Sequence, residues 1–280
     1  MSVTVQFEIL YTGYCMAPEA IAIKSGKRKS IRFHANVALI QHPDKGYVLF
    51  DTGYAPRFFE VTAKWPEKMQ ALSTPAVIEK DWDVISQLEK KGIRAKDIPH
   101  LVISHYHADH IAGLKDFPHS QFYSMKSGYD QMLRHKGFSG VRRGLIDKLM
   151  PEDIADRIDF FDSWEKVARN DAFEYHYDMF GDGSIKVVQL PGHARGQIGL
   201  LLNEGNKDAV FLAADGFWLT ESLDTNVLPS GIVRLFFDDW PAYKDSFQKI
   251  RSYRAEHPDT SIISCHCPRI FDKTPEKVYS

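Results

Sequence analysis

The chain contains little cysteine: Cys15, Cys265 and Cys267 are the three present in 280 residues. So small and odd a number cannot build the disulfide framework of a secreted scaffold, and it predicts a reducing compartment. No apolar run approaches membrane-spanning length, and the first residues lack the basic and apolar regions of a signal peptide. We therefore expect a cytoplasmic protein with no membrane partner.

A surplus of positive charge is also missing. The formal net charge is −2 at pH 7, whereas proteins that bind phosphate backbones usually carry a basic surplus. We expect no nucleic-acid partner and a small-molecule substrate instead, and a homodimer is compatible with these features. The composition, with 44% hydrophobic residues and no long linker, predicts a single domain over residues 1–280.

Three histidines and a carboxylate crowd into residues 104–110. His105, His107, Asp109 and His110 offer imidazole nitrogens and a hard anionic oxygen, a donor set that suits zinc, iron or manganese better than calcium or magnesium. The apolar run at residues 100–103 is typical of a buried parallel strand, so the motif would begin where that strand ends. Residues two apart in an extended loop point the same way, which lets His105 and His107 converge on one ion while Asp109 and His110 turn to a second.

The same arrangement recurs further along the chain. Predicted strands at residues 185–190, 209–214 and 260–264 are followed by His193, Asp215 and His266. Strand ends are where α/β sheets commonly hold their sites, because the loops there vary while the sheet stays rigid. Cys265 and Cys267 flank His266, and if the strand geometry continues, both thiols point away from a metal that His266 contacts. We expect both to be small buried residues.

In order and type, these residues resemble the metallo-β-lactamase superfamily of metal-dependent hydrolases. The likeness extends over nearly the whole chain and includes an Asp-Thr-Gly turn at residues 51–53. It implies an α/β fold of four layers, an αβ/βα sandwich of two mixed β-sheets with helices on the outer faces. It also implies a ligand set: one metal on His105, His107 and His193, the other on Asp109, His110 and His266, Asp215 bridging them, and Asp51 supporting the ligands from behind.

The resemblance implies two divalent metal ions, with zinc favoured and iron or manganese as alternatives. Two such ions lower the pKa of a water held between them, so that a bridging hydroxide forms near neutral pH and attacks the substrate. Asp109 is the best candidate to receive and return the proton. The adjacent Ser104 lacks a base of its own, and we interpret its hydroxyl as a local hydrogen-bonding group.

Within the superfamily, the chain is most similar to the N-acyl homoserine lactonases, which implies cleavage of a small lactone, ester or thioester. The resemblance to those enzymes implies an Asp-x-x-Tyr motif that begins at the bridging aspartate. This chain has Trp218 at the position of the tyrosine. Two other activities stay open: a persulfide dioxygenase with one iron, and a thioesterase similar to glyoxalase II. A protein that keeps metal without turnover is a third alternative. Candidate substrate contacts are Trp218, Phe217, Phe236 and Arg195.

Local patterns predict the remaining elements. An apolar alternation around a Pro-Asp-Lys-Gly turn predicts a hairpin over residues 37–50, and helical spacing predicts helices over residues 83–91, 127–136, 142–149 and 241–256. Residues 53–81 contain three prolines, and we interpret them as an irregular segment that crosses the active-site face. Residues 114–183 are expected to include a helical capping segment that shapes substrate choice.

Overall fold

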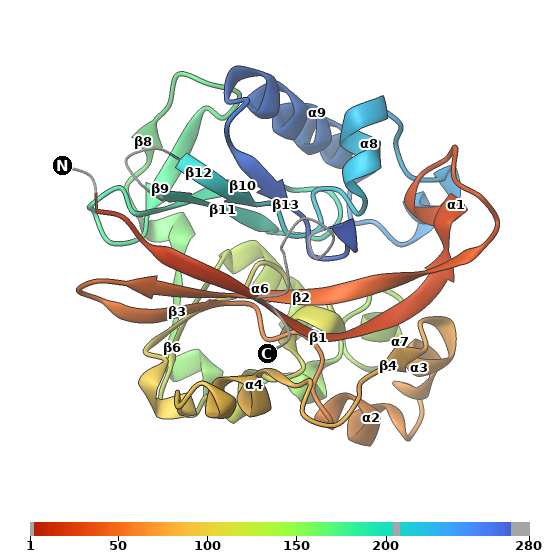
Figure 1. Ribbon diagram of the computed structural model, residues 1–280. Coiled ribbons are helices and arrows are strands. Elements are labelled where there is room, and N and C mark those ends of the chain that lie inside the picture. The colour runs from red at the N-terminus through yellow and green to blue at the C-terminus, as the bar shows by residue number, and fades with distance from the viewer. Residues whose placement is uncertain (1–2, 204–207, 270–280) are drawn as a thin grey trace.

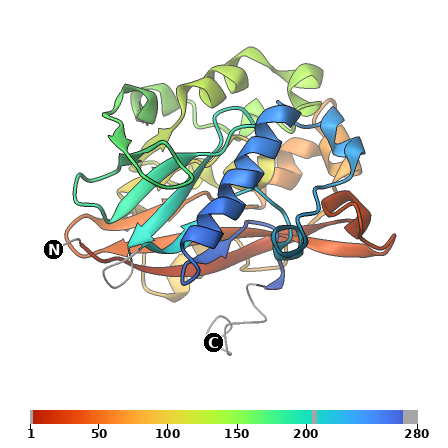
Figure 2. The same cartoon turned by 90° about the horizontal axis from the view of Figure 1, so that it is seen from above.

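The computed structural model describes residues 3–203 and 208–269 of the chain. Two β-sheets face each other, and helices cover the outer face of each sheet (Figure 1). In Figure 1, α9 and α8 lie above the upper sheet, while α4 and α2 lie below the lower sheet. Figure 2 shows the same layers from above, with α9 running across the second sheet. The predicted four-layer α/β sandwich is confirmed.

The strands of the first sheet lie in the order β4-β1-β2-β3-β5-β6-β7. Their bounds are β1 Gln6–Pro18, β2 Ser30–His42, β3 Gly46–Phe50, β4 Ala76–Val77, β5 His100–Val102, β6 Gln121–Ser124 and β7 Ile158–Phe160. The second sheet has the order β13-β12-β11-β10-β9-β8. Its strands are β8 Val167–Ala168, β9 Tyr175–Asp178, β10 Ile185–Gln189, β11 Ile198–Asn203, β12 Asp208–Leu212 and β13 Ser261–Ile263.

The α-helices and 3₁₀ turns occupy the connections between strands. The α-helices are α1 Glu19–Ala22, α2 Arg57–Thr62, α3 Lys68–Ser73, α4 Val84–Lys90, α5 Ala108–Ile111, α6 Lys126–Arg134, α7 Gly137–Val141, α8 Thr220–Thr225 and α9 Trp240–Glu256. The 3₁₀ turns are η1 Ala95–Asp97, η2 Leu114–Asp116, η3 Asp147–Leu149, η4 Ile154–Asp156, η5 Phe161–Ser163 and η6 Gly231–Leu235. None of the helices in the described part of the chain is long and apolar enough to cross a membrane.

Both sheets are mixed, and their parallel strands place loop residues at a common edge. β3, β5, β6 and β7 are mutually parallel neighbours, and β12 pairs in parallel with β13. Side chains alternate between the two faces of a strand, so Val48 and Phe50 of β3 pack between the sheets while Leu49 packs toward the helices outside. Leu201 likewise joins the core beneath α9. Packing on both faces fixes the register of these strands, and therefore the positions of their ends.

The helices α4 and α9 each begin with a side-chain cap. The Asp83 carboxylate accepts a hydrogen bond from the Ser86 amide at the start of α4, and Asp239 accepts one from the Ala242 amide at the start of α9. These caps satisfy amides that have no partner within the helix. The hairpin of β2 and β3 is confirmed, although β2 begins at Ser30, well before the predicted start at residue 37. The helices at residues 83–91, 127–136 and 241–256 are confirmed within two residues at each end.

Two local predictions are wrong. Residues 142–149 do not form one α-helix, because Gly144 has φ of +70° and Leu145 forms a β-bridge with His107. The helix α7 precedes this turn instead. Residues 53–81 are not wholly irregular, since α2, α3 and β4 lie within them. The segment at residues 114–183 contains α6 and α7, but it also contributes β6 and β7 to one sheet and β8 and β9 to the other.

Candidate metal centre

The candidate ligands gather from the ends of four strands. The histidines and aspartate of residues 105–110 follow β5 in the first sheet, while His193, Asp215 and His266 follow β10, β12 and β13 in the second. The site therefore lies where the edges of the two sheets meet, and each ligand is attached to a strand that is buried in the core. Such support limits the motion of the side chains and favours a preformed site.

His105, His107 and His193 form the first cluster. The Nε2 atom of His105 is 3.1 Å from Nδ1 of His107, which is 2.9 Å from Nε2 of His193. Ligands that sit about 2.0–2.1 Å from a tetrahedral zinc are separated from one another by roughly 3.3 Å. The three ring nitrogens therefore have the spacing of ligands around one cation.

The second cluster contains His110, Asp215, Cys265 and His266. One ligand atom from each of these residues lies within 4.8 Å of the others, and all four residues are buried. His110 Nε2 and Asp215 Oδ1 are 3.4 Å apart, and neither atom has a hydrogen-bond partner among the described residues. Buried polar atoms are normally satisfied, so these two atoms fit a cation that they would share.

Asp215 connects the two clusters. Its Oδ2 atom lies 3.1 Å from Nε2 of His193 and 2.8 Å from Nε2 of His266. The indole nitrogen of Trp218 also donates a hydrogen bond to this oxygen, at 3.2 Å. A carboxylate in this position can contact two cations at once, and the indole helps to fix its orientation.

Asp51 and Ser104 support the ligands from behind. The Asp51 carboxylate accepts hydrogen bonds of 2.7 Å from the Ser104 amide, from the Ser104 hydroxyl and from Nδ1 of His110. Because an ionised carboxylate can only accept, the proton of His110 lies on Nδ1 and leaves Nε2 for the site. The Ser104 hydroxyl also lies 3.0 Å from Nδ1 of His105. Its local hydrogen-bonding role, expected from the sequence, is seen here.

His266 is oriented by the backbone of β2. Its Nδ1 atom lies 2.5 Å from the carbonyl oxygen of His34, which leaves Nε2 directed at Asp215. The sequence did not reveal this partner, because any residue supplies a carbonyl and only the fold brings β2 to the end of β13.

The Pro-Gly-His turn holds His193 against α9. Gly192 has φ of +127°, and a Cβ atom at this position would lie 2.0 Å from the amide nitrogen of Tyr243. Only glycine allows so close an approach with this backbone conformation. The glycine before His193 thus serves the packing of this loop, which places the imidazole beside His107.

Burial keeps His105 and His107 of the first cluster neutral. Burial and the neighbouring His110 and His107 hold the pKa of His105 well below its usual range. Burial, together with His193, lowers the pKa of His107 to about 3. Neutral imidazoles have a free lone pair, which is the form that binds a metal.

The second cluster favours positive charge. Burial disfavours the ionised Asp215, but His266, His110 and His193 outweigh it and hold the pKa of this carboxyl well below its usual range. Burial likewise opposes protonation of His266, yet Asp215 and Cys265 together raise its pKa to about 10. A position that stabilises protons in this way also attracts a divalent cation.

Asp109 lies at the rim of the second cluster. Its Oδ2 atom is 3.7 Å from Nε2 of His266 and 3.9 Å from Nε2 of His110. Its side chain is 21% exposed, whereas those of His110 and Asp215 are almost completely buried. Asp109 therefore faces both the cluster and the solvent.

The predicted substrate contacts differ widely in their surroundings. The Trp218 ring lies beside His193, with ring centroids 5.8 Å apart, whereas Phe217 is fully buried in the core beneath α9. The prediction for Phe217 is wrong, because its ring has no surface to offer. Arg195 forms an ion pair with Asp238, and Phe236 is exposed at the end of η6.

The structure also corrects the expectation for Cys265. Its thiol was expected to point away from the metal site, yet it belongs to the second cluster. The reason is that β13 ends at Ile263 and the chain bends at residues 265–266, so the alternation of an extended strand no longer holds. Cys267 does point elsewhere, and its sulfur lies 3.1 Å from the Thr220 hydroxyl.

Comparison with known proteins places this geometry in a family. The sequence matches the family model of the metallo-β-lactamase superfamily over residues 31–256. The chain belongs to the metallo-β-lactamase superfamily. The predicted family and the prediction of a hydrolase of this superfamily are confirmed. Divalent metal ions are the cofactors that this membership implies, and the clustered donors described above fit them.

Several relatives within the superfamily are lactonases. N-acyl homoserine lactonase AttM of Agrobacterium fabrum is 27% identical over 203 residues, which are 71% of each chain. The probable metallo-hydrolase Rv2300c of Mycobacterium tuberculosis is 22% identical over 247 residues, or 83% of this chain and 74% of the relative.

Solved structures of lactonases share the fold. An N-acyl homoserine lactone hydrolase with the product N-hexanoyl-L-homoserine at its catalytic metal center has a TM-score of 0.72, with 16% identity over 98% of this chain and 97% of that chain. AidC, described as a dizinc quorum-quenching lactonase, has a TM-score of 0.65, with 17% identity over 96% of this chain and 89% of that chain.

Proposed function

We propose that this protein is a dinuclear metal-dependent hydrolase that cleaves a small-molecule lactone, ester or thioester. The observation that carries the proposal is the position of Asp215, which contacts His193 of the first cluster and His266 of the second through one oxygen. One buried carboxylate between two groups of imidazoles is the arrangement expected for a pair of cations that share a ligand.

The donors of the two clusters favour zinc, with iron or manganese as alternatives. His105, His107 and His193 would hold one ion, and His110, His266 and Asp109 are candidates for the other, with Asp215 between them. When bound, the two ions would lower the pKa of water enough to supply a hydroxide nucleophile near neutral pH, and they would polarise the carbonyl oxygen of the substrate. Asp51 and Ser104 would keep the ligands in the orientation that this requires.

Asp109 is the residue that we assign to proton transfer. Its partly exposed carboxylate lies beside the second cluster, within reach of both a substrate and the solvent. It can accept the proton of the attacking water and deliver it to the leaving oxygen, so that an alcohol rather than an alkoxide is released. This step opens the ring of a lactone or separates the two halves of an ester.

An apolar wall beside the first cluster supports a substrate with an acyl chain. The Phe237 ring packs on His193 and Trp218, with centroid distances of 4.8 and 5.4 Å. The neighbouring Leu235 and Phe236 are 78% and 63% exposed, and adjacent exposed apolar side chains can form part of a ligand-binding surface. The lactonase names of several relatives favour lactones among the three substrate classes.

Metal analysis and a substrate panel test the proposal. The purified protein should bind two zinc ions per chain and hydrolyse N-acyl homoserine lactones, simple lactones, aryl esters or thioesters. One iron per chain with oxygen uptake on glutathione persulfide would identify a dioxygenase instead. Metal binding without turnover over the whole panel would contradict the hydrolase.

A substitution at Asp109 tests the proton-transfer role. Asp109→Asn should lower kcat by about 10²–10⁴-fold, the usual contribution of a general acid–base residue, while circular dichroism shows a folded protein. Asp153→Asn is the matched control, because Asp153 is an exposed carboxylate paired with Arg157. A wild-type kcat in Asp109→Asn would remove this assignment.

A further inference from the structure

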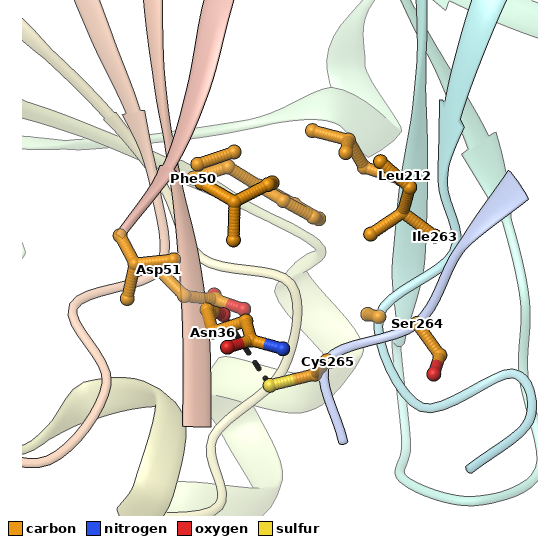
Figure 3. A pocket seen from close by; sticks show the side chains of 11 residues that line it. Asn36, Phe50, Asp51, Leu212, Ile263, Ser264 and Cys265 are labelled. Atoms are coloured by element: carbon orange, nitrogen blue, oxygen red, sulfur yellow. Dashed lines mark hydrogen bonds between the residues drawn. The ribbon is translucent and has the colours of Figure 1, made fainter. Parts of the chain in front are cut away.

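A narrow cavity lies between the two sheets, close to the second cluster (Figure 3). It is lined by Asn36, Asp51 and Cys265 among others, and its volume of about 20 Å³ has room for little more than a water molecule. An acyl chain therefore cannot enter it. The part of a substrate that extends away from the two clusters has to lie on the outer surface, and the character of that surface becomes important.

The turn that follows α7 borders the first cluster. A Cβ atom on Gly144 would lie 2.8 Å from the His107 ring, and Leu145 forms a β-bridge with His107. The amide of Ala108 also donates a hydrogen bond to the carbonyl oxygen of Gly144, at 3.2 Å. The chain segment that contains α7 is therefore fixed directly beside a candidate metal ligand.

The start of α7 contacts the loop between α2 and α3. A Cβ atom on Gly137 would lie 3.6 Å from Cγ of Pro66, and Figure 1 shows α3 and α7 at the same corner of the molecule. These two parts of the chain therefore form one continuous surface next to the first cluster. We call the surface formed by residues 59–72 and 133–148 the basic rim.

Large apolar side chains are exposed on the basic rim. Leu133, Trp65 and Phe138 are between 50% and 60% exposed. Trp65 and Phe138 directly adjoin the contact between Pro66 and Gly137, so both lie where the two segments meet. Several large apolar side chains exposed together indicate an interaction surface.

Positive charge surrounds these apolar side chains. The basic rim has seven lysines and arginines against three acidic residues. The bases are Lys64, Lys68, Arg134, Lys136, Arg142, Arg143 and Lys148, and the acids are Glu60, Glu67 and Asp147. Lys148 forms an ion pair with Glu67 at 2.8 Å, whereas the other six bases have no ion-pair partner in the described part of the chain. The basic rim therefore keeps a surplus of positive charge.

The charges of the basic rim act together at His135. Burial lowers the pKa of His135, and the nearby Arg143 and Arg134 lower it further. Arg195 acts in the same sense, and it lies two residues after His193 in the sequence. The positive region thus extends from the basic rim toward the first cluster, and it attracts anionic groups.

We infer that the basic rim docks on the surface of a membrane that contains anionic lipids. Trp65 and Phe138 would enter the headgroup region, and the surrounding lysines and arginines would contact the lipid headgroups. Amphipathic helices that lie on membranes combine the same residue types, and tryptophan favours the boundary between lipid and water. The expectation of no membrane partner rested on the lack of a membrane-spanning run, and docking at a surface needs no such run.

A second copy of the chain is a poorer occupant of this surface. A two-fold interface built on the basic rim would place the rim of one copy against the rim of the other. The positive surplus on both sides would then be repulsive. Anionic lipids complement the same charges.

Docking through the basic rim would also bring the first cluster close to the bilayer. Substrates with long acyl chains dissolve there, because each methylene group favours the bilayer over water. This consequence rests on the proposed function, whereas the docking itself does not.

Co-sedimentation of the purified protein with lipid vesicles tests the inference. The protein should bind vesicles of phosphatidylcholine with about one third phosphatidylserine more tightly than vesicles of phosphatidylcholine alone, and added salt should release it because ions screen the attraction. Arg142→Gln/Arg143→Gln should weaken binding about 30-fold, since each base near an anionic surface contributes roughly a factor of five. Lys90→Gln/Arg94→Gln is the matched control, because it removes the same charge from exposed positions outside the basic rim.

A second variant tests the apolar part of the basic rim. Trp65→Ser/Phe138→Ser should remain folded, because both side chains are exposed, and its vesicle binding should fall by about 10-fold or more. Val167→Ser is the control, since Val167 is 41% exposed on β8 of the other sheet. Wild-type binding by either rim variant, or an equal loss in the control variants, would overturn the inference.

Turnover of a water-soluble short-chain substrate separates docking from the proposed function. Both rim variants should hydrolyse it at the wild-type rate. Vesicle binding without turnover of any substrate would contradict the hydrolase and leave the docking surface intact, whereas turnover without vesicle binding would overturn the docking surface alone. Sedimentation velocity tests the second copy as the occupant: a wild-type dimer that becomes a monomer in Trp65→Ser/Phe138→Ser would identify an interface between copies and overturn the inference.

Discussion

Replacing Asp51 with asparagine should weaken metal binding without removing a metal ligand. Asp51 is buried and accepts three hydrogen bonds of 2.7 Å, two from Ser104 and one from Nδ1 of His110. In Asp51→Asn, one amide oxygen can still accept from the Ser104 backbone. The new NH₂ group, however, meets the N–H of His110, and two donors cannot bond to each other.

The conflict is relieved if His110 moves its proton to Nε2. That atom faces Asp215 at 3.4 Å, so the proton occupies the lone pair that a metal requires. Changes to residues that orient metal ligands typically cost 10- to 100-fold in metal affinity, which corresponds to about 1.4–2.8 kcal/mol. We expect a loss of this size for the second zinc, with the three-histidine cluster affected less.

Competition with a chromophoric zinc chelator measures this affinity directly, and circular dichroism checks the fold. Asp182→Asn is the matched control, because Asp182 lies 2.8 Å from Nε2 of His42, outside both clusters. It should reduce thermal stability but leave zinc affinity unchanged. If Asp51→Asn retains two zinc ions with wild-type affinity, the argument from the tautomer of His110 is refuted.

Two further substitutions address the bridging carboxylate and the first cluster. Trp218→Phe removes the indole hydrogen bond to Asp215 but keeps an aromatic ring, so kcat/KM for the best panel substrate should fall about 10-fold; an unchanged value would deny the indole an orienting role. Gly144→Ala would place a Cβ atom 2.8 Å from the His107 ring and should lower zinc occupancy of the first cluster, as measured by elemental analysis. Gly181→Ala carries the same positive φ with nothing within 4 Å, so it should share the backbone cost of about 1–2 kcal/mol but keep full occupancy.

Much of the site could be predicted because its residues stand at the ends of strongly apolar strands. The run before Ser104 and the run before Asp215 are each buried and β-branched or apolar, and polar donors follow them directly. Such a pattern is local in the sequence, so it survives without knowledge of the tertiary structure. The helix at residues 142–149 was mispredicted because Gly144 makes room for His107, a contact between residues 37 positions apart.

The support of the ligands could not be predicted in the same way. The carbonyl of His34 that orients His266 comes from a strand that lies 232 positions earlier in the chain. Phe217, which is next to Trp218 in the sequence, was predicted to contact the substrate. In the structure it faces the core beneath α9, which the sequence does not reveal. Spacing in the chain determines neither which backbone group meets a side chain nor which of two neighbours faces a site.

The sequence by itself determined the kind of chemistry and the layered fold, because donor types and the periodicity of strands and helices are local properties of short segments. The tertiary structure alone decided which donors meet. It set Asp215 between two groups of histidines, and it turned Cys265 inward where β13 ends and the chain bends. The physical reason is that coordination depends on distances of a few ångströms between side chains, and those distances arise only when the two sheets are packed against each other.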